Sequence, residues 1–513
     1  MFGEVQSATM IGLDCKMIRV EADIADGLPM FEMVGYLAGE VREARERVRA
    51  AMRNCGLALP ARKVTVNLSP GDVRKAGASF DLPIAVALLL AAGFFSKKTA
   101  GILRKTLILG ELGLNGEVQR VNGVLPITAA IDQNQISCCI VPADNALEGA
   151  AAASVPCYGV RSLRETVDFL LGKTELRAQG SDWETEHLTQ REDDAPDFQD
   201  IAGQEGVKRA AQIAAAGFHN LLMIGPPGVG KTMIARPIPG ILPTMSDRER
   251  LILSKIYSIA GLLPPDKPIL EKRPFRAPHH QVTGAALIGG GTIPRPGEVT
   301  LAHRGVLFLD ELSEFSRTAL EMLRQPLEER EVALARLGGR YVYPADFMLV
   351  AAMNPCACGY YPDRTRCVCG RREIQRHINK MSQALLDRMD LCVEIPRVAY
   401  ERLARRDKGE CSAEIRRRVE EAVLAQEKRY EGTPFRFNAD LTAAAVEQFC
   451  PLTEQVQDLL EKAFRRLDLS ARAYHRLIRV ARTIADLDQS ERIQTAHMAE
   501  AIAYRSINKT YWR

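Results

Sequence analysis

Residues 221–235 are LLMIGPPGVGKTMIA, an apolar run that passes into a glycine-rich loop and then into a helical pattern. From Gly225 to Thr232 the loop matches the P-loop spacing G-x-x-x-x-G-K-[ST]. Such a loop surrounds phosphates with backbone N–H groups, and a strand before it and a helix after it are the context that the motif requires. We therefore predict a site for ATP and Mg²⁺. Its loop residues are expected to be Gly225, Pro226, Pro227, Gly228, Val229, Gly230, Lys231 and Thr232.

Two carboxylates supply the second part of this predicted site. The apolar run GVLFLDEL, residues 305–312, ends in Asp310 and Glu311. Such a pair is a weak signal alone, but it becomes specific when it follows a P-loop in the same chain. Asp310 is expected to hold Mg²⁺ together with Thr232, while Lys231 reaches the β- and γ-phosphates. Glu311 is expected to polarise the attacking water.

A third strand-like segment, DFMLVAAMNP at residues 346–355, ends in Asn354. An amide at the end of a buried strand can orient the lytic water, so we assign Asn354 to the catalytic group. Taken alone, an asparagine before a proline is more often a turn residue. The catalytic interpretation therefore depends on the P-loop and the acidic strand that precede it.

Four cysteines follow at once, in NPCACGYYPDRTRCVCG at residues 354–370. Cys356, Cys358, Cys367 and Cys369 form the pattern C-x-C-x8-C-x-C, and two pairs that close a short loop suit the tetrahedral Cys₄ site that zinc prefers. The polar residues between the pairs have no core of their own, so a metal would organise them. We predict a structural Zn²⁺. A redox role is less favoured because no C-x-x-C opens a helix, and four free thiols are the remaining alternative.

The composition is that of a globular chain with several domains. It has 513 residues, of which 46% are hydrophobic and 26% charged, and a net charge of +4, which alone says nothing about nucleic acid. No basic segment followed by an apolar run opens the chain, and the longest apolar run, residues 82–95, is too short to cross a bilayer. We expect a cytoplasmic protein without a membrane partner. Disulfides are rare in that compartment, which favours metal or redox chemistry for clustered cysteines.

Three structured parts and one linker are predicted. In the N-terminal part KVTVNL at 63–68 has strand alternation, residues 40–56 have helical spacing, and Asn115–Gly116 is a strong hairpin signal. A polar, acidic segment follows, then a second alternating part, and the remainder is helical and rich in arginine. The predicted boundaries are 1–175 for an α+β domain, 176–200 for the acidic linker, 201–396 for the α/β P-loop core and 397–513 for a helical lid.

The order of P-loop, acidic strand and asparagine strand resembles that of AAA+ ATPases. Longer stretches resemble the magnesium-chelatase-like branch of these enzymes, and within it the YifB/ComM family, over essentially the whole chain. These stretches are RPFRAPHH (273–280), IGGGTIPRPGEVTLAHRGVLFLDEL (288–312), RQPLEER (324–330), AAMNPCACGYYPD (351–363), LLDRMDL (385–391) and ARTIADL (481–487). The resemblance implies a core that carries a helix-2 insert, a pre-sensor-1 hairpin and the cysteine loop, and a lid that carries a sensor-2 helix.

The resemblance also assigns arginines to the nucleotide site. Arg388 in LLDRMD resembles the arginine finger that completes the site of a neighbouring subunit, and a trans arginine that stabilises charge on the γ-phosphate is physically reasonable. An ordinary surface ion pair is the alternative role for this side chain. The segment at 470–487 resembles the sensor-2 helix, in which Arg472 is the first candidate for contacting nucleotide and Arg476 the second.

The N-terminal domain resembles the Lon-protease-like fold (ribosomal protein S5 domain 2-like) in residues 75–93 and 109–127. Such proteases use a serine–lysine dyad, because the lysine must act as the base. Ser79 lies near the expected position of the serine. The lysine should follow the hairpin, but none occurs between Lys105 and Lys173. We therefore expect a proteolytically inactive domain that serves binding or assembly.

Two segments are candidates for contact with DNA, because insertions line the central channel in the branch of ATPases that this chain resembles. They are residues 279–299, which include Arg295, and the hairpin-like residues 332–344, in which Arg336 and Arg340 flank glycines. Glycines and arginines at the tip of a hairpin suit a loop that follows phosphates. An ordinary solvated hairpin would have the same composition.

Taken together, the sequence predicts an ATPase that forms a ring, expected to be a hexamer, and moves on single-stranded or branched DNA. The resemblance to the YifB/ComM family implies helicase activity in branch migration during recombination or natural transformation. Two alternatives remain: a motor subunit of the magnesium-chelatase kind, and an ATPase that remodels proteins. Stimulation of ATP hydrolysis by DNA separates the first possibility from the other two.

Overall fold

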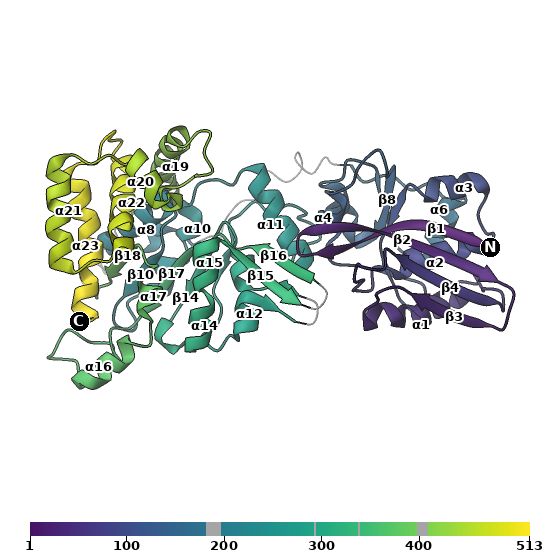
Figure 1. The fold of residues 1–513 in the computed structure, drawn as a ribbon, viewed down its shortest axis with the longest axis horizontal. Coiled ribbons are helices and arrows are strands. Elements are labelled where there is room, and N and C mark those ends of the chain that lie inside the picture. Colours follow the sequence, from purple (N-terminus) through teal and green to yellow (C-terminus); the bar gives the residue numbers. More distant parts are fainter. Residues whose placement is uncertain (181–195, 292–293, 337–338, 398–408, 513) are drawn as a thin grey trace.

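The computed structural model describes residues 1–180, 196–291, 294–336, 339–397 and 409–512. Most of the predicted acidic linker, the start of the predicted lid and part of the tip of the predicted hairpin lie outside these residues. The chain is elongated, with the N-terminal domain at one end, the P-loop core in the middle and the C-terminal helices at the other end (Figure 1). Among the described helices, none is both long and apolar enough to cross a membrane.

The N-terminal domain is built on a mixed seven-stranded sheet of order β3-β4-β2-β1-β5-β8-β9. Its strands are β1 (Phe2–Ile11), β2 (Asp14–Ala25), β3 (Met30–Val34), β4 (Lys63–Ser69), β5 (Thr106–Ile108), β8 (Cys138–Pro142) and β9 (Cys157–Val160). Its main helices are α1 (Gly39–Asn54), α2 (Asp81–Ala91), α3 (Lys97–Leu103), α4 (Val124–Thr128), α5 (Ala146–Ala150) and α6 (Leu163–Leu170). Strand β4 alternates buried and half-buried residues, as its sequence alternation predicts. The predicted strand at 63–68 and helix at 40–56 are confirmed.

The predicted hairpin at Asn115–Gly116 is also confirmed. Strands β6 (Glu111–Leu112) and β7 (Val118–Gln119) pair antiparallel around it. The Asn115 side chain accepts a hydrogen bond from the backbone N–H of Glu117 at 3.1 Å, and Gly116 has a φ of +88°, a conformation that favours glycine. Local side-chain chemistry therefore fixes this turn.

The P-loop core has a parallel five-stranded sheet of order β11-β14-β17-β10-β18. Its strands are β10 (Leu221–Ile224), β11 (Phe275–Arg276), β14 (Val306–Leu309), β17 (Met348–Met353) and β18 (Leu391–Glu394). All residues of β10, β14 and β17 are buried, because apolar clusters cover both faces of the sheet. Strands buried on both faces are continuous apolar runs, which is the pattern that their sequences show. The predicted α/β core is confirmed.

Helices and two small excursions surround this sheet. The helices are α8 (Glu205–Gly217), α9 (Lys231–Ala235), α10 (Ile238–Ile241), α11 (Asp247–Ala260), α14 (Arg317–Met322), α15 (Arg324–Glu329), α16 (Arg371–Ile378) and α17 (Gln383–Leu386). The first excursion is the insert α12 (Gly284–Ile288), β12 (Gly289–Gly290), β13 (Arg295–Pro296) and α13 (Glu298–Leu301). The second is the predicted hairpin, formed by β15 (Glu331–Arg336) and β16 (Gly339–Pro344). The buried Tyr343 hydroxyl donates to the Pro294 carbonyl at 2.8 Å, so the two excursions are tied together.

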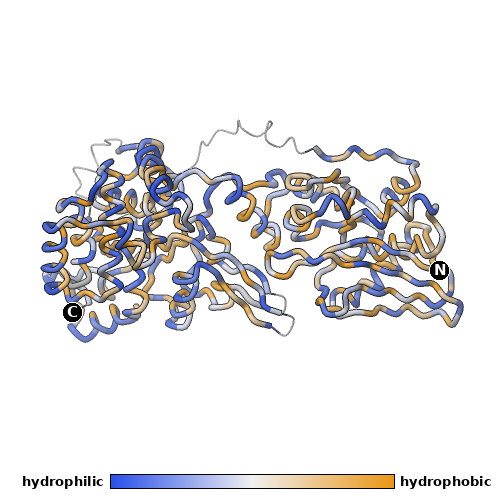
Figure 2. Tube along the Cα trace, turned by 45° about the horizontal axis from the view of Figure 1, so that its top comes forward, coloured by the Kyte–Doolittle hydropathy of each residue, from blue (hydrophilic) through white to orange (hydrophobic). Residues whose placement is uncertain are grey.

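The C-terminal part is helical, as its sequence predicts. It contains α19 (Ser412–Arg429), α20 (Ala443–Phe449), α21 (Glu454–Leu467), α22 (Ala471–Leu487) and α23 (Thr495–Tyr511). Buried apolar clusters fill all three parts of the chain, and the outer turns of these last helices are mainly hydrophilic (Figure 2). This amphipathic pattern is what packs the helices on one another.

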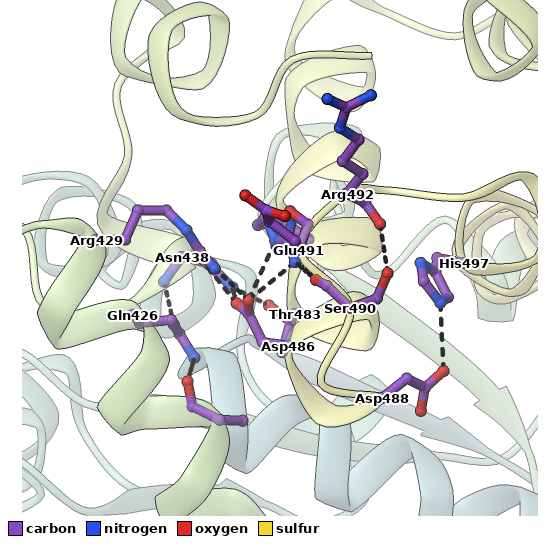
Figure 3. A network of polar contacts seen from close by, with 12 residues as sticks. Gln426, Arg429, Asn438, Thr483, Asp486, Asp488, Ser490, Glu491, Arg492 and His497 are labelled. Carbon is purple, nitrogen blue, oxygen red and sulfur yellow. Dashed lines mark hydrogen bonds and ion pairs between the residues drawn. The ribbon is translucent and has the colours of Figure 1, made fainter. Parts of the chain in front are cut away.

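Asp486 on α22 joins the C-terminal helices through a polar network (Figure 3). Its carboxylate accepts hydrogen bonds from Arg429 at 2.5 and 3.1 Å, from Asn438 Nδ2 at 2.8 Å and from Arg482 Nε at 3.2 Å. The side chain is almost fully buried, and a buried charge is tolerated when it is paired and hydrogen-bonded. The network holds α19 against α22 and thereby fixes the helix that carries the predicted sensor arginines.

The N-terminal domain packs on the core at a joint formed by α4 and α11, and Gly12, between β1 and β2, also lies against Val342 of β16. Leu125 of α4 is fully buried and clusters with Leu263 and Ile269 of the core. Beside this cluster the buried Glu148 carboxylate accepts hydrogen bonds from the Leu125 backbone N–H at 3.1 Å and from the Ser258 hydroxyl of α11 at 2.5 Å. The joint thus combines apolar burial with satisfied buried polar groups, which favours a defined docking geometry.

Candidate active site

The glycines of the P-loop serve different geometric needs. Gly228 and Gly230 have φ angles of +76° and +86°, which a residue with a side chain rarely adopts. Gly225 lies so close to the neighbouring chain that an added Cβ would be 2.7 Å from the Ile395 carbonyl oxygen. The loop follows β10 directly and opens α9, which Pro237 ends early because a proline cannot continue the helix. The motif therefore has the strand–loop–helix setting that a phosphate cradle needs.

Lys231 occupies the centre of the site. Its ammonium group donates to the carbonyls of Gly225 and Pro226 at 2.9 and 3.0 Å and to Asn354 Oδ1 at 2.9 Å. Burial lowers the pKa of this lysine, while the nearby carboxylates of Asp310 and Glu311 oppose that shift. The structure thus brings the predicted P-loop lysine and the predicted asparagine together across 123 positions of sequence.

The two predicted carboxylates, Asp310 and Glu311, directly follow β14, and the Glu311 backbone N–H donates to Asp310 Oδ1 at 2.9 Å. Thr232 Oγ1 donates to Asp310 Oδ2 at 2.6 Å, so the two predicted Mg²⁺ ligands are already adjacent. Both offer oxygen atoms, the donors that Mg²⁺ prefers, so this pair fits the ion. Glu311 has a φ of +50°, a strained conformation for a non-glycine residue, and its side chain is half exposed. His280 lies 3.7 Å from the Glu311 carboxylate.

A pocket of about 440 Å³ lies next to the P-loop. It is bordered by loop residues from Pro227 to Gly230, by Met233 and by two segments that the sequence analysis did not assign, Asp200–Gln204 and Arg397. Gln204 ties these segments together, because its Nε2 donates to the Pro396 carbonyl at 2.7 Å. The pocket thus adjoins the loop that is predicted to hold the phosphates. Only long-range folding brings its walls together, so no local motif marks them.

The three predicted nucleotide-contacting arginines lie at the opposite edge of the sheet. Asp390 precedes β18, and its backbone N–H donates to the carbonyl of Asn220, which precedes β10. Arg476 donates to the Asp390 carboxylate at 2.9 Å, and the Arg388 carbonyl accepts from Asn220 Nδ2 at 3.0 Å. Because β10 and β18 are parallel, this is the amino edge of the sheet, whereas Lys231 follows its carboxyl edge. These arginines therefore cannot contact a nucleotide held by Lys231 of the same chain.

Glu328 of α15 connects two of these arginines. Its carboxylate forms an ion pair with Arg388 and lies 3.2 Å from Arg472. Arg388 is almost fully buried beneath it, whereas Arg472 is two-thirds exposed. Burial, together with the neighbouring Arg324, lowers the pKa of Arg388, although Glu328 opposes the shift. The arrangement places Arg472 at the surface, with Arg476 partly and Arg388 almost fully covered beside it, and we call this region of the protomer the arginine face.

The four clustered cysteines converge as predicted. Their sulfur atoms all lie within 4.8 Å of one another, and the Sγ distances are 3.3 Å for Cys356–Cys358, 3.7 Å for Cys356–Cys367 and 3.6 Å for Cys358–Cys367. A tetrahedral Zn²⁺ with Zn–S bonds of about 2.3 Å requires Sγ atoms about 3.8 Å apart. The cluster therefore fits such an ion. It also packs on the nucleotide site, because an added Cβ at Gly359 would be 2.4 Å from Pro227.

The three predicted DNA-contacting arginines lie on the two excursions of the core. Arg295 on β13 is exposed. Arg336 ends β15, and its Nε donates to the Gly291 carbonyl at 3.3 Å. Arg340 on β16 is 70% exposed and lies 3.8 Å from Glu331. All three belong to the pair of excursions that Tyr343 ties together.

The Lon-like features of the N-terminal domain have structural roles. The Ser79 carbonyl accepts a hydrogen bond from the Gly110 backbone N–H at 3.0 Å. In the segment GVLPITAA, where a lysine base was expected and is missing, Leu125 is buried against the core. The interpretation of an inactive domain used for assembly is consistent with this packing.

Known protein families match most of the chain. Residues 197–403 match the family described as magnesium chelatase, subunit ChlI, residues 409–505 match its C-terminal part, and residues 20–145 match the family described as subunit ChlI of Mg-chelatase. Lon protease 2 of Bacillus subtilis is 32% identical over 147 residues, which cover 27% of this chain and 26% of that protease. The predicted Lon-like N-terminal fold is confirmed.

Two relatives match from end to end. Competence protein ComM of Haemophilus influenzae is 39% identical over 506 residues, which cover 98% of this chain and 97% of that protein. The protein YifB of Escherichia coli is 42% identical over 509 residues, with 98% and 97% covered. The chain belongs to the YifB/ComM family of magnesium-chelatase-like AAA+ ATPases.

Proposed function

We propose that this protein is an ATP-hydrolysing motor that forms a ring, hexameric in its working state, and moves on single-stranded or branched DNA. One observation supports the proposed ring assembly: Lys231 and Glu311 lie at one edge of the sheet, and Arg388 lies at the other. One protomer therefore holds only part of a catalytic site. A closed, head-to-tail ring places the arginine face of each protomer against the P-loop of the next.

Each residue then has a role that its contacts support. Lys231 holds the β- and γ-phosphates, and Thr232 with Asp310 would hold Mg²⁺, which when bound would supply positive charge beside the phosphates. Glu311 polarises the attacking water, and Asn354 orients it. The arginine face of the neighbour, which carries Arg388, Arg472 and Arg476, stabilises charge on the γ-phosphate.

DNA as the track is supported by two independent features. The tied excursions present exposed arginines on strands that meet at one end of the core, which suits contact with phosphates. In addition, the relative from Haemophilus influenzae bears the name competence protein. We propose ComM-like branch migration in the cytoplasm as the activity that joins these features.

Stimulation by DNA is the direct test of this proposal. We expect ATP hydrolysis to increase several-fold with single-stranded DNA or a four-way junction, because the two excursions proposed to bind DNA belong to the same core as the nucleotide site. Phosphate release is measured with single-stranded, duplex and junction DNA, and Lys231→Ala serves as the blank. Intact basal hydrolysis that no DNA changes would instead favour a chelatase-like or protein-remodelling role.

We propose that the cysteine cluster holds one structural Zn²⁺ per chain, because its Sγ spacing fits a tetrahedral ion. When bound, the ion would close the loop between the two cysteine pairs. The loop packs on Pro227 and follows Asn354 directly, so its order bears on the nucleotide site. The role of the bound Zn²⁺ is therefore to hold one wall of the nucleotide site in place.

Substitution of two cysteines tests the zinc site. Cys356→Ser with Cys358→Ser is expected to reduce bound zinc from about one ion per chain to nearly none, because two of four thiolate ligands are lost. Zinc content is measured by elemental analysis of purified protein. Cys411→Ser is the matched control, because Cys411 caps α19 and serine is a favoured residue at that position. Unchanged zinc content in the double variant contradicts the assignment.

A further inference from the structure

The cysteine loop and α16 form a projecting unit at the margin of the core (Figure 1). Its surface is rich in cations, all of them exposed: Arg364, Arg366, Arg371, Arg372, Arg376 and Lys380. The only carboxylates in the same stretch are Asp363 and Glu373. Glu373 is engaged in capping α16, because its carboxylate accepts from the Gly370 backbone N–H at 2.8 Å. The unit therefore carries a concentrated positive charge, although the whole chain is close to neutral.

The arginines of α16 are unpaired. Within the described residues, the structure gives no ion pair to Arg371, Arg372 or Arg376, while Arg364 lies over the Tyr361 ring at 5.0 Å. Arg372 and Arg376 are four positions apart on one helix, a spacing at which like charges repel. This arrangement opposes helix stability in the isolated protomer. An anionic partner would convert the repulsion into attraction.

Several exposed cations on other helices of the same chain pair with a carboxylate of their own helix. On α19 Arg417 pairs with Glu421 at 2.9 Å, and on α21 Arg465 pairs with Glu461 at 2.5 Å, both at helical spacing. Those faces are ordinary solvated surfaces whose charges cancel locally. Helix α16 lacks this cancellation, so its charge is not explained by solubility alone.

The unit is also joined to the nucleotide site. His377 of α16 is buried, and its Nε2 lies 3.0 Å from the Asn354 carbonyl oxygen. Asn354 in turn accepts from Lys231, as described above. A partner bound at the exposed face of α16 would thus be separated from Asn354, which accepts from Lys231, by this one helix.

We propose that this basic unit, defined as residues 364–380, is a second contact for the phosphate backbone of nucleic acid, separate from the two excursions. The proposal rests on the proposed function in one respect, that the track is DNA. Arginine forks match phosphate oxygens, and the exposed residues of α16 are Arg371, Arg372, Arg376 and Glu373, of which Glu373 is engaged in capping. A protein partner would require an apolar centre, whereas residues 364–380 expose one large apolar side chain, Val368, and none on α16. The expected contact is independent of base sequence.

The test removes three charges and measures the salt dependence of binding. The triple variant Arg371→Gln, Arg372→Gln, Arg376→Gln is compared with wild type on labelled single-stranded DNA by fluorescence anisotropy. We expect the slope of log K against log salt to become shallower by about 2 and affinity to fall roughly 10-fold or more, equally for different sequences. Arg417→Gln, Lys462→Gln, Arg465→Gln is the matched control, because it removes the same charge from paired positions. The control is expected to retain the wild-type slope.

The possible outcomes separate this inference from the proposed function. Basal ATP hydrolysis, zinc content and thermal unfolding of the triple variant are expected to match wild type, which establishes that it is folded. Wild-type protein that binds no DNA overturns the proposed function and this contact with it. Wild-type binding with an unchanged slope in the triple variant overturns the contact alone. An unchanged slope with loss of ring assembly, measured by mass photometry, assigns the unit to a neighbouring subunit instead.

Discussion

Arg388→Ala is expected to lower ATP hydrolysis by about a thousandfold or more, because an arginine that stabilises charge on the γ-phosphate is worth that much in P-loop GTPases. ATP binding should remain, because Lys231 and its partners lie at the other edge of the sheet. Hydrolysis is measured as phosphate release, and binding with a fluorescent nucleotide. A purely local role of the Glu328–Arg388 ion pair would leave hydrolysis nearly unchanged.

Mixing two inactive variants tests the trans geometry directly. Arg388→Ala retains its own P-loop, and Lys231→Ala retains its own arginine face. In randomly mixed rings about one quarter of the interfaces pair the intact P-loop of the Arg388→Ala variant with the intact arginine face of the Lys231→Ala variant. Hydrolysis should therefore partly return. Each variant mixed with itself is the control. No recovery in the mixture, with rings assembled, would mean that both residues act within one protomer.

Glu311→Gln is expected to reduce hydrolysis by about 10²- to 10³-fold while ATP remains bound, because a general base contributes that much and the amide cannot accept a proton. The Thr232–Asp310 pair that would hold Mg²⁺ is left intact. Single-turnover phosphate release and nucleotide binding are measured on the same preparation. Glu314→Gln is the control, because Glu314 is exposed and pairs with Lys380 rather than facing the P-loop. Equal losses of hydrolysis in the two variants would show that Glu311 has no specific role in the reaction.

Much of the nucleotide site could be predicted because strand ends are visible in sequence. Strands β14 and β17 are continuous apolar runs, and a polar residue directly after such a run lies at the carboxyl edge of a parallel sheet. Asp310 and Asn354 therefore had to lie near the P-loop, and they contact Thr232 and Lys231. The cysteine cluster could be predicted for a related reason, since its members are separated only by a short loop.

Partners that depend on long-range packing could not be predicted. Glu328 of α15 pairs with Arg388, about 60 positions further along the chain, and nothing in the sequence near either residue indicates that contact. The same holds for Arg397, which borders the nucleotide pocket from a position far from the P-loop. Periodicity shows which face of an element is buried but does not identify what covers it. The division of the site between two edges of the sheet therefore required the structure.

The apolar joint at Leu125 has an evolutionary consequence. A lysine base restored in this segment would bring an ammonium group among Leu263 and Ile269, where desolvation strongly disfavours the charged form. It would also disturb Glu148, which already binds Ser258 of the core. Regaining peptide hydrolysis would thus require the N-terminal domain to detach from the P-loop core. At this position a charged lysine base and the apolar joint to the core therefore exclude each other.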